Sequence, residues 1–407
     1  MKNSFVFILF TVVLLGCSGH KNTELQTGVW RATMQVQDNE LLPFNFKVVT
    51  TGGKTMLEVY NAEEVLKITE ISFRKDSIFI DMPVFEGVIK GVFSETQISG
   101  VFEQADLGRS VVFEAYAKDA DRFKNTSPSK INVAGVWEVN FSPNTPDSYP
   151  AKGIFKQVGN TVTGTFRTET GDYRYLEGVV SGNELKLSTF DGAHVFLFLA
   201  RLENDVLSGV FYSGKHFKEP FVAKRNSDFD LISSDSLTYL KEGFKKLNFS
   251  FPNDKGVLVS LDDAAYQNKV VIVQIMGTWC PNCLDETKFL TSYLKENANP
   301  NLKVISLAFE YAKTPELAFK RIAKLRKRLQ VPYPILLAQY NGADKGKAQE
   351  KLPMLNHVLS YPTAIFIDKK GTVRKIHTGF NGPATGEKYV EFTTEFESFV
   401  AQLLSEN

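Results

Sequence analysis

The sequence predicts three folded domains, in which two all-β domains precede one α/β domain. The chain has 407 residues, which is too many for one small core at about 150 residues per domain. Apolar and polar residues alternate in the first two-thirds, whereas strand and helix patterns alternate in the last third. Phenylalanine is abundant, with 33 residues against 14 tyrosines and 3 tryptophans, and this aromatic weight favours strand-rich cores.

The β prediction depends on short segments with period-two alternation. Residues 77–81, 160–166 and 184–188 alternate in this way, and glycine-containing turns separate such segments. We therefore expect antiparallel hairpin meanders. They would form small barrels or sandwiches, which limit the number of exposed strand edges, and the sequence does not decide between the two.

Short motifs recur in this region at nearly the same spacing. Gly28-Val29-Trp30 returns as Gly135-Val136-Trp137, and residues 98–102 return in similar form as 207–211. A duplicated module is the simplest explanation. The predicted boundaries are residues 28–118 for the first copy and 131–226 for the second, with a polar linker around 118–130 between them.

The last domain is predicted over residues 236–407. The apolar run Val270–Met276 is typical of a parallel strand covered on both faces, and a helix is expected over 280–297. We also expect a helix at 236–247, a hairpin at 249–261, strands at 302–309 and 335–338, a helix from Thr314-Pro315 to 329, a hairpin over 363–377 and a helix at 387–404. This pattern predicts a mixed sheet with helices on both faces.

The net charge does not point to a nucleic-acid partner. The 47 basic and 46 acidic residues leave a net charge of +1, which gives no support to nucleic-acid binding. Basic residues crowd the predicted helix near 314–329, where a solvated face is the first interpretation and a docking surface for an acidic partner is the alternative. The crowded residues are Lys320, Arg321, Lys324, Arg326, Lys327 and Arg328.

The N-terminus carries a targeting signal. Lys2 precedes a short apolar run, and Leu14-Leu15-Gly16-Cys17 resembles a bacterial lipobox. We expect residues 1–16 to be a signal peptide, Cys17 to be lipidated and 17–27 to be a linker. Ser18 lacks the aspartate type of inner-membrane retention signal, which favours an outer-membrane anchor facing the periplasm. The alternative is an ordinary signal peptide with Cys17 near the cleavage point.

Only Cys280 and Cys283 remain once Cys17 is lipidated. Their spacing at the start of a helix suits reversible disulfide chemistry. The unpaired N–H groups at a helix N-terminus favour a thiolate, so Cys280 is expected to attack and the more buried Cys283 to resolve. Half of a zinc site is the alternative, but zinc prefers four ligands and the chain has no further cysteine and only 5 histidines.

Two separated motifs resemble one family. The stretch 277–286 contains Trp279-Cys280-Pro281-Asn282-Cys283, and Tyr361-Pro362-Thr363 opens the stretch 361–368. Together they resemble the TlpA/ResA group of thioredoxin-like thiol:disulfide oxidoreductases, in the AhpC/TSA redoxin superfamily, over about residues 247–405. The resemblance implies a thioredoxin-like fold and a cis Pro362 against the cysteines. A cis proline would expose the backbone of Tyr361 for pairing with a substrate segment.

The resemblance also implies that Glu286 is a partly buried carboxylate that shuttles protons near the cysteines. The strand position that could hold such an acid is Gln274, which does not titrate. A surface glutamate that assists the helix N-terminus is the alternative for Glu286. Trp279 is expected to form an aromatic wall beside the nucleophile, and Tyr361 and Thr363 are further candidates for substrate contact.

These expectations combine into a functional hypothesis. The chain would be an envelope lipoprotein that reduces disulfides in protein substrates, in cytochrome c maturation or thiol repair, and a membrane electron donor would regenerate it. No cofactor, metal or nucleic acid is expected. The alternative is a lipoprotein whose β modules bind a ligand or glycan while the redox domain is accessory.

Overall fold

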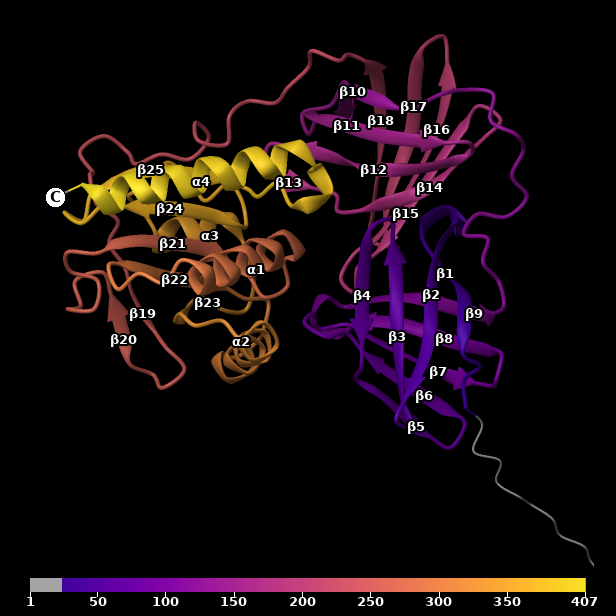
Figure 1. The fold of residues 1–407 in the computed structure, drawn as a ribbon, viewed down its shortest axis with the longest axis horizontal. Helices are drawn as coiled ribbons and strands as arrows, with labels where there is room; N and C mark the ends of the chain where they lie inside the picture. The colour runs from indigo at the N-terminus through magenta and orange to yellow at the C-terminus, as the bar shows by residue number, and fades with distance from the viewer. Residues whose placement is uncertain (1–23, 407) are drawn as a thin grey trace, which may run out of the picture.

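The computed structural model describes residues 24–406 and consists of three domains in chain order (Figure 1). The predicted signal peptide and the predicted lipidation site Cys17 lie outside the described residues. None of the helices in residues 24–406 has the length and apolar character needed to cross a membrane.

The first domain is a nine-stranded antiparallel sheet in the order β4-β3-β2-β1-β9-β8-β7-β6-β5. Its strands curl around a core that includes the fully buried side chains of Trp30, Phe44, Phe46 and Phe113. The strands are β1 (Gly28–Gln35), β2 (Leu41–Thr51), β3 (Lys54–Asn61), β4 (Glu64–Ile68), β5 (Ile71–Arg74), β6 (Ser77–Asp81), β7 (Val88–Phe93), β8 (Gln97–Gln104) and β9 (Arg109–Ala117).

The second domain is a nine-stranded sheet that closes on itself, because β12 pairs with both β11 and β14. A separate core of aromatic side chains fills it, including Trp137, Phe141, Phe166 and Phe198. The strands are β10 (Gly135–Phe141), β11 (Tyr149–Val158), β12 (Thr161–Thr168), β13 (Gly171–Asp172), β14 (Leu176–Ser181), β15 (Glu184–Phe190), β16 (Val195–Glu203), β17 (Val206–Ser213) and β18 (Phe217–Arg225). For this domain the closed barrel is therefore the correct alternative.

The two β domains have the same strand neighbours around a corresponding tryptophan. Trp30 on β1 donates its indole N–H to the carbonyl of Gln26 over 2.8 Å, and Trp137 on β10 donates to the carbonyl of Val133 over 2.8 Å. Strand β1 lies between β2 and β9, and β10 lies between β11 and β18. The two Gly-Val-Trp motifs thus occupy the same place in the two sheets.

The predicted polar linker is fixed between the two β domains by Arg122, whose side chain is buried. Its guanidinium donates to the Tyr60 carbonyl and the Asn61 side chain in the first domain, and to the side chain and carbonyl of Ser188 in the second. Burial lowers the pKa of Arg122 to about 10, against the opposing effect of Glu177. The linker therefore joins the two cores through buried hydrogen bonds.

The predicted helix at 236–247 is wrong, because this segment is irregular. Its backbone bonds across the domain: the Lys241 N–H donates to the Met354 carbonyl over 2.8 Å, and the Tyr239 N–H donates to Asn356 over 2.9 Å. Gly243 has a φ of +89°, which is outside the helical region. The expected hairpin follows as β19 (Ser250–Pro252) and β20 (Leu258–Ser260).

The C-terminal domain is built on a five-stranded mixed sheet in the order β23-β22-β21-β24-β25. All residues of β21 (Val270–Met276) are buried, as expected for a central strand. The remaining elements are α1 (Pro281–Glu296), β22 (Leu302–Phe309), α2 (Pro315–Leu329), β23 (Ile335–Gln339), α3 (Lys345–Lys351), β24 (Thr363–Ile367), β25 (Val373–Thr378) and α4 (Glu387–Ser405). Helices α1 and α4 contact each other, with the Phe289 and Phe396 ring centroids 4.8 Å apart.

Helix α2 docks against the first β domain. Arg321 forms ion pairs with Asp106 and, over 3.8 Å, with Glu86, and Lys324 donates to the Met82 carbonyl over 3.0 Å. Arg328 adds a contact of 3.0 Å with Glu70. The interpretation of this basic helix face as fully solvated is therefore wrong, because much of its charge is matched by acidic residues and carbonyls of the same chain.

Candidate active site

The two cysteines lie where β21 gives way to α1. Cys280 is the N-cap residue of α1, and Pro281 occupies the first turn, where its missing N–H has no helical partner to lose. Cys280 and Cys283 form a disulfide, and the Cys283 N–H points at the Cys280 sulfur over 3.1 Å. The described state is therefore the oxidised one, and the helix N-terminus is positioned to stabilise a thiolate on Cys280 after reduction.

The cysteines differ in exposure. Cys280 exposes 5% of its surface and Cys283 exposes 0%. The Cys280 sulfur also lies 3.4 Å from the carbonyl oxygen of Tyr361. This arrangement agrees with the prediction that Cys280 is the attacking thiol, because it is the one of the two that reaches the surface.

The Tyr361–Pro362 peptide bond is cis, as the family resemblance implied. The Tyr361 carbonyl that belongs to this cis bond is the one that lies 3.4 Å from the Cys280 sulfur. Thr363 begins β24 and turns its hydroxyl toward the Ser360 carbonyl, to which it donates over 2.9 Å. Thr363 therefore supports the proline loop in the described state, and a direct role in substrate contact stays a prediction.

Trp279 forms one wall of the site. Its indole N–H donates to the Phe309 carbonyl over 2.9 Å, which fixes the ring. Its ring centroid lies 4.7 Å from that of Tyr311 and 5.6 Å from that of Tyr361. The expected aromatic surface beside Cys280 is therefore present.

Glu286 is buried behind the cysteines on α1, with 1% of its surface exposed. The Gln274 amide donates to one of its carboxyl oxygens over 2.8 Å, while the other oxygen has no hydrogen-bond partner within residues 24–406. Burial raises the pKa of Glu286 to about 8, and the Gln274 hydrogen bond opposes this in part. The alternative of a surface glutamate is therefore wrong, and the residue can carry a proton near neutral pH.

A second buried carboxyl group near the cysteine motif belongs to Glu310, which no sequence motif marks. Glu310 directly follows β22 and exposes 0% of its surface. It accepts hydrogen bonds from the Thr278 backbone N–H over 2.8 Å and from the Thr278 hydroxyl over 2.7 Å. Burial raises the pKa of Glu310 to about 7. The available signal was its position at the carboxyl end of a parallel strand, the sheet edge that also holds the cysteines.

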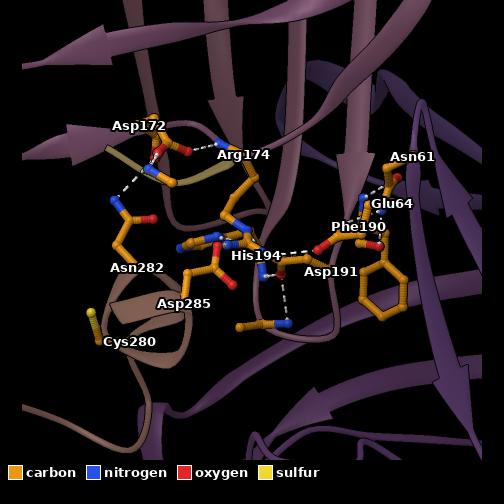
Figure 2. A network of polar contacts seen from close by, with 12 residues as sticks. Asn61, Glu64, Asp172, Arg174, Phe190, Asp191, His194, Cys280, Asn282 and Asp285 are labelled. Atoms are coloured by element: carbon orange, nitrogen blue, oxygen red, sulfur yellow. Dashed lines mark hydrogen bonds and ion pairs between the residues drawn. The ribbon is translucent and has the colours of Figure 1, made fainter. Parts of the chain in front are cut away.

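A network of charged side chains from all three domains surrounds the start of α1 (Figure 2). Its centre is Arg174, which has a φ of +63° and 4% of its side chain exposed. The Arg174 guanidinium pairs with Asp285 on α1, with Glu64 of the first domain over 2.6 Å and with Asp191 over 3.5 Å. Burial alone would lower the pKa of Arg174, but the carboxylates, Glu64 foremost, raise it.

The second β domain also touches the redox motif itself. The Asn282 amide, between the two cysteines, donates to the Asp172 carbonyl over 3.3 Å (Figure 2). The carboxylate of Asp172 accepts from the Arg174 N–H over 2.8 Å and from the Gly382 N–H over 2.7 Å. No sequence pattern predicted the contacts of Asp172 with Asn282 and Gly382, because these partners are more than a hundred residues away from Asp172.

A cavity of about 480 Å³ opens between the second β domain and the cysteines. Its lining comes from both sides and includes Tyr149, Tyr173, Phe196, Trp279, Cys280 and Tyr361. Within residues 24–406, no group of three or more His, Cys, Asp or Glu side chains is placed to hold a metal ion.

Comparison with known proteins agrees with this geometry. Residues 243–376 match the AhpC/TSA family. The thioredoxin-like protein YneN of Bacillus subtilis is 29% identical over 146 residues, which cover 34% of this chain and 73% of that protein. The thiol-disulfide oxidoreductase ResA of Halalkalibacterium halodurans is 26% identical over 156 residues, covering 37% and 76% of the two chains. The C-terminal domain is a TlpA/ResA-type redoxin domain.

A solved thiol-disulfide oxidoreductase from Bacteroides fragilis is similar to this chain at 19% identity, with 37% of this chain and 99% of that chain covered and a TM-score of 0.27. The protein is a thiol:disulfide oxidoreductase, because its redoxin domain carries a Cys280–Cys283 disulfide at the N-terminus of α1 beside a cis proline. The two β domains lie outside the matched region.

Proposed function

We propose that this oxidoreductase is a lipid-anchored reductase of the bacterial cell envelope that acts on disulfides in protein substrates. The observation that carries the proposal is the pair Cys280 and Cys283 in a chain of three cysteines. The third, Cys17, follows Leu14-Leu15-Gly16 and would be consumed by lipidation. No second thiol pair is then left in the mature chain, so the exchange partner must be another molecule.

The reaction follows from the geometry of the cysteines. In the reduced protein, the Cys280 thiolate attacks one sulfur of a substrate disulfide, forms a mixed disulfide and releases the other substrate sulfur as a thiolate. Cys283 then attacks the Cys280 sulfur, which releases the second substrate thiol and forms the disulfide described above. Two electrons pass to the substrate, and a dithiol donor in the membrane would return the protein to its reduced form.

Glu286 is placed to manage the proton in the second step. It lies three residues after Cys283 on α1, and its pKa of about 8 leaves it mostly protonated at neutral pH, with a minor carboxylate fraction that can accept a proton. Removing the proton from the buried Cys283 thiol generates the resolving thiolate. Cytochrome c maturation or general thiol repair would be the cellular setting.

A ligand-binding lipoprotein with an accessory redox domain is the second candidate. The cavity argues for the first candidate, because the second β domain lines the same space as Cys280 and contacts Asn282. In the first candidate function the β domain would serve the redox site.

An insulin-reduction assay tests the oxidoreductase proposal. The wild-type protein is expected to reduce insulin or a mixed-disulfide peptide with dithiothreitol as donor, whereas Cys280→Ala is expected to be inactive. Equal and negligible activity of both proteins on both substrates would refute it. The anchor is tested separately by labelling cells with palmitate: the wild type should incorporate the label and Cys17→Ser should not.

A further inference from the structure

The second β domain covers the approach to Cys280. The turn between β12 and β13 lies against the cis-proline loop, where the Ser360 hydroxyl donates to the Thr170 carbonyl over 3.0 Å. Its next residues contact the redox motif through Asn282 and the Asp172 carbonyl. These contacts help to explain why Cys280 exposes only 5% of its surface. A broad protein surface cannot reach this sulfur in the described arrangement.

The cavity beside Cys280 sets the size of what can reach it. Its volume of about 480 Å³ falls in the range of small-ligand pockets. A stable contact between two folded proteins instead buries about 800 Å² on each side. The space therefore suits a few residues of extended chain. Aromatic rings of both domains line it, with Tyr149, Tyr173 and Phe196 from the second β domain and Trp279 and Tyr361 from the redoxin domain.

The covering position is built into the structure. Arg174 ties Asp285, two residues after Cys283, to both β domains. Gly171 allows a close approach: its φ is +149°, and an added Cβ would lie 2.1 Å from the Asn282 amide nitrogen. Helix α2 braces the other side of the redoxin domain through Arg321 and Asp106. Buried ion pairs and a close backbone approach of this kind fix the relative position of domains.

We propose that the second β domain forms half of the substrate site and restricts it to disulfides on short extended segments of polypeptide with an aromatic or apolar neighbour. This inference rests on the proposed reductase function. The aromatic neighbour would lie between the two aromatic walls, while its disulfide meets the Cys280 sulfur beside the Tyr361 carbonyl. Disulfides on the surface of a folded protein would be excluded by the β12–β13 turn.

The first experiment compares one disulfide in two settings. The extended substrate is a linear peptide with a glutathione mixed disulfide beside a phenylalanine, and the folded substrate carries the same mixed disulfide on a surface cysteine of a globular protein. The wild type is expected to have a kcat/KM at least about tenfold higher for the peptide, a ratio typical of discrimination by a pocket. Equal kcat/KM values for the two would overturn the proposal.

A filling substitution tests the cavity directly. Glu169 is half-buried and lines the cavity on the β12–β13 turn, so Glu169→Trp should lower kcat/KM for the peptide about tenfold. The matched control is Glu203→Trp, which makes the same change at an exposed position of the same domain outside the cavity lining. Identical peptide kinetics for both variants would contradict the assignment of this cavity to the substrate.

A third measurement needs no turnover, so it separates failure of this inference from failure of the oxidoreductase function. In a Cys17→Ser/Cys283→Ser background, Cys280 is the sole thiol and its alkylation can be followed with iodoacetamide and with a polyethylene-glycol maleimide. The bulky reagent is expected to react much more slowly relative to iodoacetamide than it does with a free cysteine peptide. Arg174→Ala should reduce this difference; a bulky reagent that already reacts at the free-peptide ratio in the parent would refute the covering role.

Discussion

Replacing Glu286 by glutamine should remove a large part of the pH dependence of stability. The wild-type carboxyl group is buried, and its pKa rises from 4.5 to about 8 on folding. The folded state therefore binds this proton more tightly than the unfolded state. The associated stability is present below pH 4.5 and is lost progressively as the pH rises to about 8, because the unfolded chain then releases the proton at no cost.

The magnitude follows from the pKa shift. One pH unit in this window costs about 1.4 kcal/mol of stability, and the full shift corresponds to about 5 kcal/mol. Between pH 5 and pH 7 the wild type should lose between about 2 and 3 kcal/mol that Glu286→Gln does not lose. The glutamine carbonyl can still accept the hydrogen bond from Gln274, so the variant retains the main contact of the site.

The assay is urea unfolding of the oxidised protein at pH 5, 6 and 7. The difference in unfolding free energy between Glu286→Gln and the wild type should increase with pH in favour of the variant. Glu296→Gln is the matched control, because Glu296 is exposed on the same helix. A difference for Glu286→Gln that is constant from pH 5 to pH 7 would refute the assignment of a buried, protonated carboxyl group.

Further predictions concern exchange and domain packing. Cys283→Ser should trap a substrate on Cys280 as a mixed disulfide visible on a non-reducing gel, and its absence with a substrate that the wild type reduces would count against the assigned order of attack. Glu286→Gln should also shift the pH profile of Cys280 exchange kinetics, whereas Glu296→Gln should not. Arg122→Ala removes hydrogen bonds to both β domains and should cost about 3 kcal/mol in urea unfolding, with Arg201→Ala as a surface control below about 0.5 kcal/mol. Glu310→Ala leaves the Thr278 N–H and hydroxyl unpaired and should cost about 2 kcal/mol, while an unchanged midpoint would show that water replaces the carboxylate.

The local parts of the site were predictable from the sequence. The sequence around Cys280 predicted its local structure, because a buried strand is followed within a few residues by a cap residue and by Pro281 in the first helical turn. The start of helix α2 was also predictable, because Thr314 is a cap residue and Pro315 follows it at the first helical position. The alternation of apolar residues also predicted both β domains, although closure of the second also needs the long-range pairing of β10 with β18, which leaves no local signature.

The interdomain contacts were not predictable by the same means. Arg174 and Glu64 are paired across 110 residues, and Arg122 lies in a stretch whose composition is typical of a solvated linker. The expected helix at 236–247 failed for a related reason. Its apolar residues do recur at helical spacing, but the backbone N–H groups of Lys241 and Tyr239 bond to Met354 and Asn356 instead of to a helix.

The contact between Asn282 and Asp172 has an evolutionary consequence. Cys-X-X-Cys motifs span several units of thiolate pKa, so the two intervening residues are a site at which redox properties can drift between relatives. Here one of them is also a docking residue, and Gly171 opposite has no room for a side chain. Substitutions at 282 would be selected for fit to the β12–β13 turn as well as for chemistry. We expect the two positions to change together among proteins that share this three-domain architecture.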